Sequence, residues 1–140
     1  MDPTDVQGID HIGIFTRDFD QVTHLFGGVL GAEVSEPEEA ADLGLEILWV
    51  RLGGVALEFI RALDAEGPAA ERLASEGPGV HHIAVRVRDA EGALRAVVDA
   101  GIGVVDQTPR AGVRGSQIAF LERSDVGGTV VELVQPQSTS

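Results

Sequence analysis

Two histidines occupy matching positions in two similar segments of the chain. Residues 8–18 and 79–89 carry Gly, His, Ile, Arg and Asp at the same places when they are aligned at an offset of 71. The offset pairs His11 with His82. A single coincidence of this length would be weak evidence for a repeat.

Two glutamates form a second pair, in the same order along the chain. Residues 54–60 and 128–134 share Gly and Glu amid apolar residues at an offset of 74, which pairs Glu58 with Glu132. Two ordered matches at nearly the same offset indicate a duplicated module of about 70 residues.

Imidazole and carboxylate groups in this arrangement favour a metal site. All four residues lie in predicted strands, where Val and Ile are preferred, and burying such polar groups costs free energy unless a partner satisfies them. A divalent cation would satisfy them, and Zn, Fe, Co, Ni or Mn suits these ligands. Such a site can keep positions open for substrate. For one isolated residue, a hydrogen-bonded His or a solvent-facing Glu is the better interpretation; the duplicated placement favours the metal for the set.

A third pair of polar residues joins Glu46 to Gln117, again at an offset of 71. Both are expected to face the cavity that holds the metal site. A carboxylate beside a metal-bound substrate there would transfer protons. An exposed Glu at a strand end is an equally supported alternative. Trp49 is expected to face away from Glu46, into the core.

Other polar residues carry weaker signals. The 109–115 loop contains Arg110 and Arg114 with two Gly and one Pro, which suits either contact with an anionic ligand or a solvated loop. His81 and His24 are assigned no role.

The elements that must position these residues follow the repeat. Asp18 and Asp89 are placed as helix N-caps, Gly27 and Gly28 weaken the first helix, and a short helix begins at Pro68. Strands are predicted over 9–15, 32–35, 45–52 and 55–61, and again over 80–87, 103–106, 116–122 and 129–134. Each module is therefore βαβββ. Residues 1–140 are expected to form one domain, with modules over about 8–64 and 79–136 and a connector over 65–78.

Composition excludes several classes of protein. The chain has 140 residues and no Cys, so disulfides and thiolate chemistry are excluded. Its net charge is −13, and all ten basic residues are Arg, which argues against nucleic-acid binding. The chain shows neither a secretory signal nor a stretch apolar enough to span a membrane, so a cytoplasmic protein is the expectation.

These motifs resemble the vicinal oxygen chelate superfamily, which includes glyoxalase I, extradiol dioxygenases and bleomycin- or fosfomycin-resistance proteins. The resemblance rests on residues 9–14, 79–84 and 127–135, and covers roughly residues 8–136. Within the superfamily the chain is most similar to methylmalonyl-CoA epimerases, through residues 57–60 and 109–121.

The resemblance implies an α+β fold in which two tandem βαβββ modules form a cupped, barrel-like mixed sheet around a metal. It implies metal ligands at His11, Glu58, His82 and Glu132, a divalent ion (Co, Mn, Ni, Zn or Fe), an acyl-CoA or related small-molecule substrate and a homodimer. It also implies 1,1-proton transfer at the carbon alpha to a thioester, with Glu46 and Glu132 exchanging the proton from opposite faces.

The chain departs from these epimerases at several positions. Some of them carry Gln where this chain has Glu58. They usually have a Phe-Leu-His-Pro-Lys segment where this chain has Phe-Leu-Glu-Arg-Ser from Phe120, and an aromatic pair where it has Leu25 and Phe26. Another enzyme of the superfamily (a glyoxalase I-like isomerase, a lyase or a secondary-metabolism enzyme) and a drug-sequestering protein are therefore alternatives.

Overall fold

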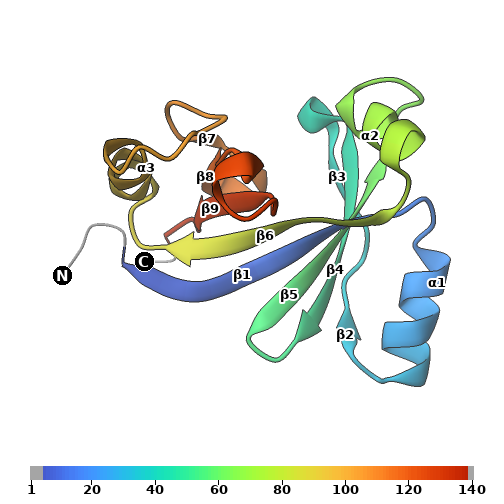
Figure 1. Ribbon diagram of the computed structural model, residues 1–140. Coiled ribbons are helices and arrows are strands. Elements are labelled where there is room, and N and C mark those ends of the chain that lie inside the picture. Colours follow the sequence, from blue (N-terminus) through green and yellow to red (C-terminus); the bar gives the residue numbers. More distant parts are fainter. Residues whose placement is uncertain (1–4, 139–140) are drawn as a thin grey trace. The chain divides into compact units, whose positions relative to one another are not determined.

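The computed structural model describes residues 5–138, whose helices and strands alternate in the order of the predicted repeat (Figure 1). The elements are β1 (Val6–Phe15), α1 (Asp20–Val22), η1 (Thr23–Val29), β2 (Glu33–Val34), β3 (Glu38–Ala40), η2 (Ala41–Leu43), β4 (Leu45–Leu52), β5 (Val55–Ala62), α2 (Pro68–Glu76), β6 (Gly79–Val87), α3 (Ala90–Asp99), β7 (Arg110–Ala111), η3 (Val113–Gly115), β8 (Gln117–Phe120), η4 (Arg123–Asp125) and β9 (Val131–Gln135). The predicted α+β class with two βαβββ modules is confirmed.

The chain divides into two compact units, which we call the first and the second unit. The first unit is His11–His81, and the second combines the described residues up to Asp10 with those from His82 onward. The boundaries fall within β1 and β6, so each of these strands contributes to both units. The expectation of one domain over the whole chain stays a prediction.

In the first unit, β5 lies between β1, to which it is parallel, and β4, to which it is antiparallel. The short strands β2 and β3 both pair antiparallel with β4. Gly53 and Gly54 form a two-residue hairpin between Leu52 and Val55, the tight connection for which paired glycines are suited. This hairpin sets the β4–β5 register.

The two faces of the first unit's sheet pack against different helices. One face packs against α1 and the residue before it through the cluster Phe19, Val22, Leu48, Val50 and Phe59. The other face packs α2 at one end through Phe15, Ile60, Ala69 and Leu73. Because alternate strand residues point to opposite faces, these clusters define which residues share the α1 face and which share the α2 face.

The second unit repeats this arrangement. Its strand β9 is parallel to β6 and antiparallel to β8, and β7 pairs with β8. Helix α3 covers one face through Val87, Ala90, Ala93, Leu94, Ala119, Leu121 and Leu133. Ala84, Ile118 and Val134 form a separate cluster with Phe120 packed against it; these residues alternate with the α3-facing ones and so belong to the opposite face.

The two helices of the repeat begin differently. Asp89 caps α3 as predicted, because its Oδ1 accepts a hydrogen bond from the Gly92 N–H. The predicted cap at Asp18 is wrong: α1 has Phe19 at its N-cap, and the Asp18 carboxylate accepts from the Asp20 N–H in the preceding turn. After one turn the helix continues as the π-helix η1, which contains both expected helix-weakening glycines.

Most strand boundaries agree with prediction, and three differences concern short elements. The predicted strand over 103–106 is instead a single bridge between Val104 and Leu121. Strand β3 was not predicted, since its sequence Glu-Glu-Ala has low strand propensity. Strand β7 lies inside the segment predicted as the 109–115 loop. The connector helix at Pro68 is confirmed as α2.

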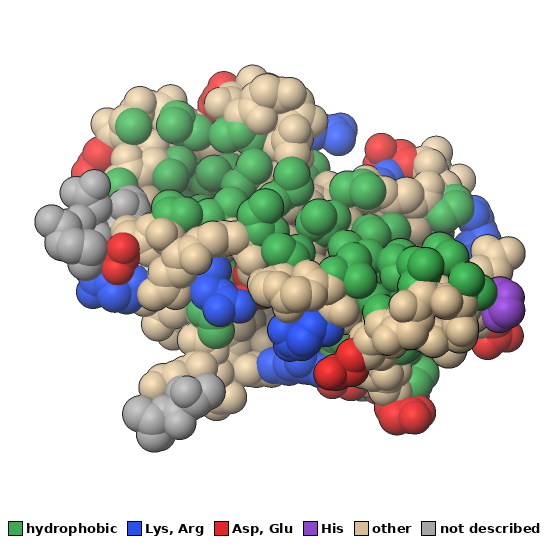
Figure 2. All heavy atoms as spheres, turned by 90° about the horizontal axis from the view of Figure 1, so that it is seen from below, with side chains coloured by type: hydrophobic (Ala, Val, Ile, Leu, Met, Phe, Trp, Pro, Cys, Tyr) green, Lys and Arg blue, Asp and Glu red, His purple; other side chains and the backbone are tan. Residues whose placement is uncertain are grey.

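Apolar side chains reach the surface at several places, and Figure 2 shows many of them gathered on the face it presents. Over all described residues, on whichever face, the more exposed large apolar side chains are Val6, Ile9, Leu25, Val29, Leu30, Leu43, Leu52, Val80, Val98 and Val105. The predicted homodimer stays a prediction. Among residues 5–138, every helix is too short or too polar to cross a membrane.

Candidate metal centre

The first unit holds His11 and Glu58 as a buried pair. His11 Nε2 lies 3.5 Å from Glu58 Oε1, and both side chains are less than one-tenth exposed. Strand register explains the contact: Gly13 lies opposite Glu58 in the parallel β1–β5 pair, and His11, two residues earlier, points to the same face.

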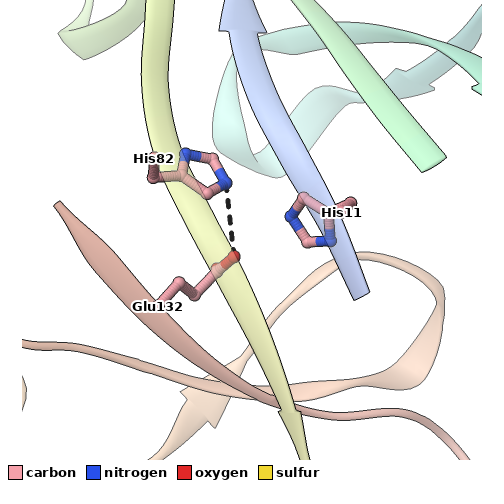
Figure 3. A group of neighbouring side chains, drawn as sticks. All are labelled: His11, His82 and Glu132. Atoms are coloured by element: carbon pink, nitrogen blue, oxygen red, sulfur yellow. Dashed lines mark ion pairs between the residues drawn. The ribbon is translucent and has the colours of Figure 1, made fainter. Parts of the chain in front are cut away.

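The second unit holds His82 and Glu132 in an equivalent arrangement. His82 Nε2 lies 3.3 Å from Glu132 Oε1, and both side chains are again buried. Figure 3 shows these two side chains pointing toward each other from β6 and β9. Here Ala84 lies opposite Glu132, two residues after the histidine, so the second pair reproduces the register of the first.

An aromatic ring accompanies each histidine. Trp49 lies opposite Glu58 in the β4–β5 pair, and its ring meets His11 edge-on with centroids 5.6 Å apart. In the second unit, Phe120 lies opposite Glu132 and meets His82 edge-on at the same 5.6 Å. The expectation that Trp49 faces away from Glu46 agrees with the structure, but its assignment to the core is wrong because the side chain is only half-buried, beside His11.

The separations within the pairs suit a shared cation. Two donors that each lie about 2.1 Å from one ion are roughly 3.0–3.4 Å apart for octahedral or tetrahedral angles. The two observed N···O separations, 3.3 and 3.5 Å, match this spacing closely. Both separations exceed the usual range, roughly 2.7–3.2 Å, of an N–H···O hydrogen bond. The donor set therefore fits a divalent metal.

Glu46 lies on the other face of the first unit's sheet. It alternates with Ile47 and shares the α1 face with Leu48. Arg61, directly opposite on β5, donates to its Oε1 from both Nε and a terminal nitrogen at 2.7 Å, and also stacks over the Phe19 ring at 4.1 Å. The structure thus does not bring Glu46 to the face of His11 and Glu58.

Gln117 occupies the position in the second unit that corresponds to Glu46 in the first. It is exposed, it lies opposite Gln135 on β9, and it alternates with Ile118, so it also lies on the helix-covered side of its sheet. The offset of 71 correctly identified equivalent positions, but the sheet face of both differs from the expectation.

In the 109–115 loop, for which ligand contact and a solvated loop are the two alternatives, Arg110 makes two contacts within the chain. Its guanidinium lies over the Phe120 ring at 5.6 Å and donates to Asp106 Oδ1 at 3.0 Å. Arg114 lies in η3 with a positive φ of 56°. His81 packs edge-on against Phe15 with ring centroids 5.1 Å apart, and His24 is exposed on η1.

The site offers an intrinsic optical probe, because Trp49 is the only tryptophan of the chain. We expect Co²⁺ or Ni²⁺ to quench its fluorescence in a saturable way, since an open-shell ion bound to His11 would lie close to the indole. Titration of the metal-free protein at constant ionic strength measures this effect. His11→Ala should lose the saturable quenching, whereas quenching that persists unchanged in this variant would place the metal elsewhere.

The chain is similar to known proteins over most of its length. The family model described as glyoxalase/bleomycin resistance protein/dioxygenase superfamily matches residues 10–120. The chain is 31% identical to the uncharacterized protein YqjC of Bacillus subtilis, over 92% of both chains. It is 30% identical to the ethylmalonyl-CoA/methylmalonyl-CoA epimerase of Cereibacter sphaeroides, over 91% of this chain and 96% of that one.

A solved structure gives the same result for the fold. A variant of the Streptomyces coelicolor methylmalonyl-CoA epimerase, in complex with 2-nitronate-propionyl-CoA, superposes with a TM-score of 0.84 and 29% identity, covering 95% of this chain and 99% of that one.

Proposed function

Since the chain belongs to the glyoxalase/bleomycin resistance protein/dioxygenase superfamily, we propose that it is a metal-dependent epimerase. The reaction is 1,1-proton transfer at the carbon alpha to a thioester, with methylmalonyl-CoA or a closely related acyl-CoA as substrate. The observation that carries the proposal is the pair of matched His–Glu contacts, one in each unit, with the spacing of metal ligands.

The proposed metal site uses both pairs. His11, His82 and Glu132 are buried and each offers one ligand atom. We propose Glu58 as the fourth ligand, because its Oε1 lies 3.5 Å from His11 Nε2. When bound, a divalent cation supplies Lewis acidity that stabilises negative charge developing on a carbonyl oxygen. Two neutral imidazoles and two carboxylates balance the ion's charge, which suits a buried site.

The substrate class rests on the relatives. The ethylmalonyl-CoA/methylmalonyl-CoA epimerase of Cereibacter sphaeroides matches 91% of this chain, and a variant of the Streptomyces coelicolor methylmalonyl-CoA epimerase forms a complex with 2-nitronate-propionyl-CoA. In our proposal Glu132 exchanges the alpha-proton on one side of the substrate. The half-buried rings of Trp49 and Phe120 pack edge-on against the two histidines and cover part of each imidazole.

Hydrogen exchange at the alpha carbon tests the proposed function. Metal-loaded protein incubated with methylmalonyl-CoA in D₂O is expected to incorporate deuterium at C2 and to equalise the two epimers, because each turnover removes the alpha-proton. NMR or mass spectrometry measures the exchange. If metal-loaded protein gives neither deuterium incorporation nor inversion, this substrate is wrong; glutathione-dependent turnover of methylglyoxal would instead indicate a glyoxalase I-like enzyme.

A further inference from the structure

A second carboxylate lies on the same sheet face as His11 and Glu58, on the short strand β3. Glu38 lies opposite Ile47 in the antiparallel β3–β4 pair, so the two residues share a face. Ile47 is two residues from Trp49, which lies opposite Glu58. The register therefore places Glu38 on the face that carries the His–Glu pair.

Contacts of the Glu38 side chain agree with this register. Its Oε2 accepts a long hydrogen bond of 3.4 Å from Trp49 Nε1, and the Trp49 ring packs against His11. Glu38 is half-buried. One indole thus contacts both a metal-ligand candidate and a carboxylate, which places the Glu38 carboxylate beside the ring that packs on His11.

The repeat also places a charged side chain at the equivalent position of the second unit. In the second unit, Arg110 lies opposite Ile118, as Glu38 lies opposite Ile47 in the first, and Ile47 and Ile118 are 71 residues apart. Arg110 stacks over Phe120, the ring that packs against His82. In both units, this edge-strand position carries a charged side chain that contacts the aromatic ring beside the histidine.

We propose that Glu38, and not Glu46, is the second proton-transfer group of the epimerase, acting together with Glu132. The assignment rests on the proposed function. In one direction the C–H bond at the alpha carbon breaks, the proton passes to a Glu38 carboxylate oxygen, and the electron pair delocalises into the thioester as an enolate. Glu132, protonated, then delivers its proton to the other side of that carbon, where a new C–H bond forms. The reverse reaction exchanges these roles.

The test compares three conservative variants in D₂O, starting from each epimer of methylmalonyl-CoA separately. Glu38→Gln keeps the size of the side chain and an oxygen for the Trp49 N–H, so folding should be preserved. Glu39→Gln is the matched control, because Glu39 is next along β3, points to the opposite face and lies opposite Glu46. Glu46→Gln represents the competing assignment. Elemental analysis gives the metal content of every variant.

The expected result for Glu38→Gln is a loss of inversion by about 10²–10⁴-fold, the usual contribution of a positioned acid or base. One epimer should still exchange its alpha-hydrogen with retained configuration, because Glu132 remains, and metal content should equal that of the wild type. Glu39→Gln should invert and exchange like the wild type.

Two results would overturn the assignment while leaving the proposed function intact. The first is inversion by Glu38→Gln within about threefold of wild type, far less than the loss of an acid or base produces. The second is single-epimer exchange in Glu46→Gln instead of Glu38→Gln. Loss of metal from Glu38→Gln would also overturn it, since Glu38 would then be a ligand. If wild-type protein fails to exchange either epimer, the proposed function is wrong and the Glu38 assignment falls with it.

Discussion

Replacing His82 with alanine is expected to reduce the affinity for the divalent metal by more than about 100-fold, because loss of even an outer-shell partner of a ligand typically costs 10–100-fold. Proton exchange at the alpha carbon should fall with metal occupancy. The physical reason is that His82 is a buried imidazole 3.3 Å from the Glu132 carboxylate, and alanine offers neither a ligand nor a partner for that carboxylate. Isothermal titration of the metal-free protein and elemental analysis measure the loss.

His81→Ala is the matched control for this substitution. His81 is the adjacent residue on β6, and its ring packs against Phe15, so its removal should leave metal content near that of the wild type. Equal metal affinity in the two variants would contradict the assignment of His82. Because the alanine leaves a buried carboxylate without its imidazole, His82→Gln should be measured as well; it retains a polar side chain, and it too should lose the metal.

Removing the metal is expected to lower the stability of the folded chain by about 4 kcal/mol when the free ion is initially at 1,000 times its Kd, since a ligand of the native state stabilises by RT ln(1 + [L]/Kd). For a domain of this size, that change corresponds to a decrease in Tm of roughly 12–16 °C. The four polar groups are each about 5% exposed, and they lose their common partner when the ion leaves. Differential scanning calorimetry with and without a chelator measures the shift.

The control for this experiment is a protein that cannot bind the ion. The double variant His11→Ala with His82→Ala should show the same Tm with chelator and with added metal. If the wild type also unfolds at one temperature regardless of chelator, the four residues do not hold a metal that stabilises the fold. Restoration of the original Tm when a divalent ion is added back would show that chelation acted on the site and not on the rest of the chain.

Much of the candidate site can be predicted from the sequence, because its residues recur in the duplicated modules. His11 and His82 could be paired from the aligned segments alone, and the strand register then places each one beside its own glutamate. The sheet face of Glu46 could also be predicted from the sequence. Gly53 and Gly54 are suited to a two-residue hairpin, which puts Trp49 opposite Glu58 and therefore turns Glu46 to the opposite face.

The position of Glu38 on this sheet face could not be predicted from the sequence in the same way. Its strand has three residues, two of them glutamates, so local propensity gives no reason to expect pairing. The strand forms because the edge of β4 offers hydrogen-bonding groups there, which is a tertiary effect. The change of repeat offset from 71 to 74 has a simpler origin: the connection between β8 and β9 is longer than the two-glycine turn between β4 and β5.

The opposite charges at the equivalent positions Glu38 and Arg110 have an evolutionary consequence. A homodimer of single modules would carry the same residue at both positions, because one gene segment would encode both. Fusion of the duplicated halves into one chain removes that restriction. Selection can then keep the paired histidines and the paired glutamates of the two modules identical while the edge strands diverge. One edge strand then carries a glutamate and the other an arginine. A fused chain can in this way become asymmetric enough to distinguish the two ends of a small substrate.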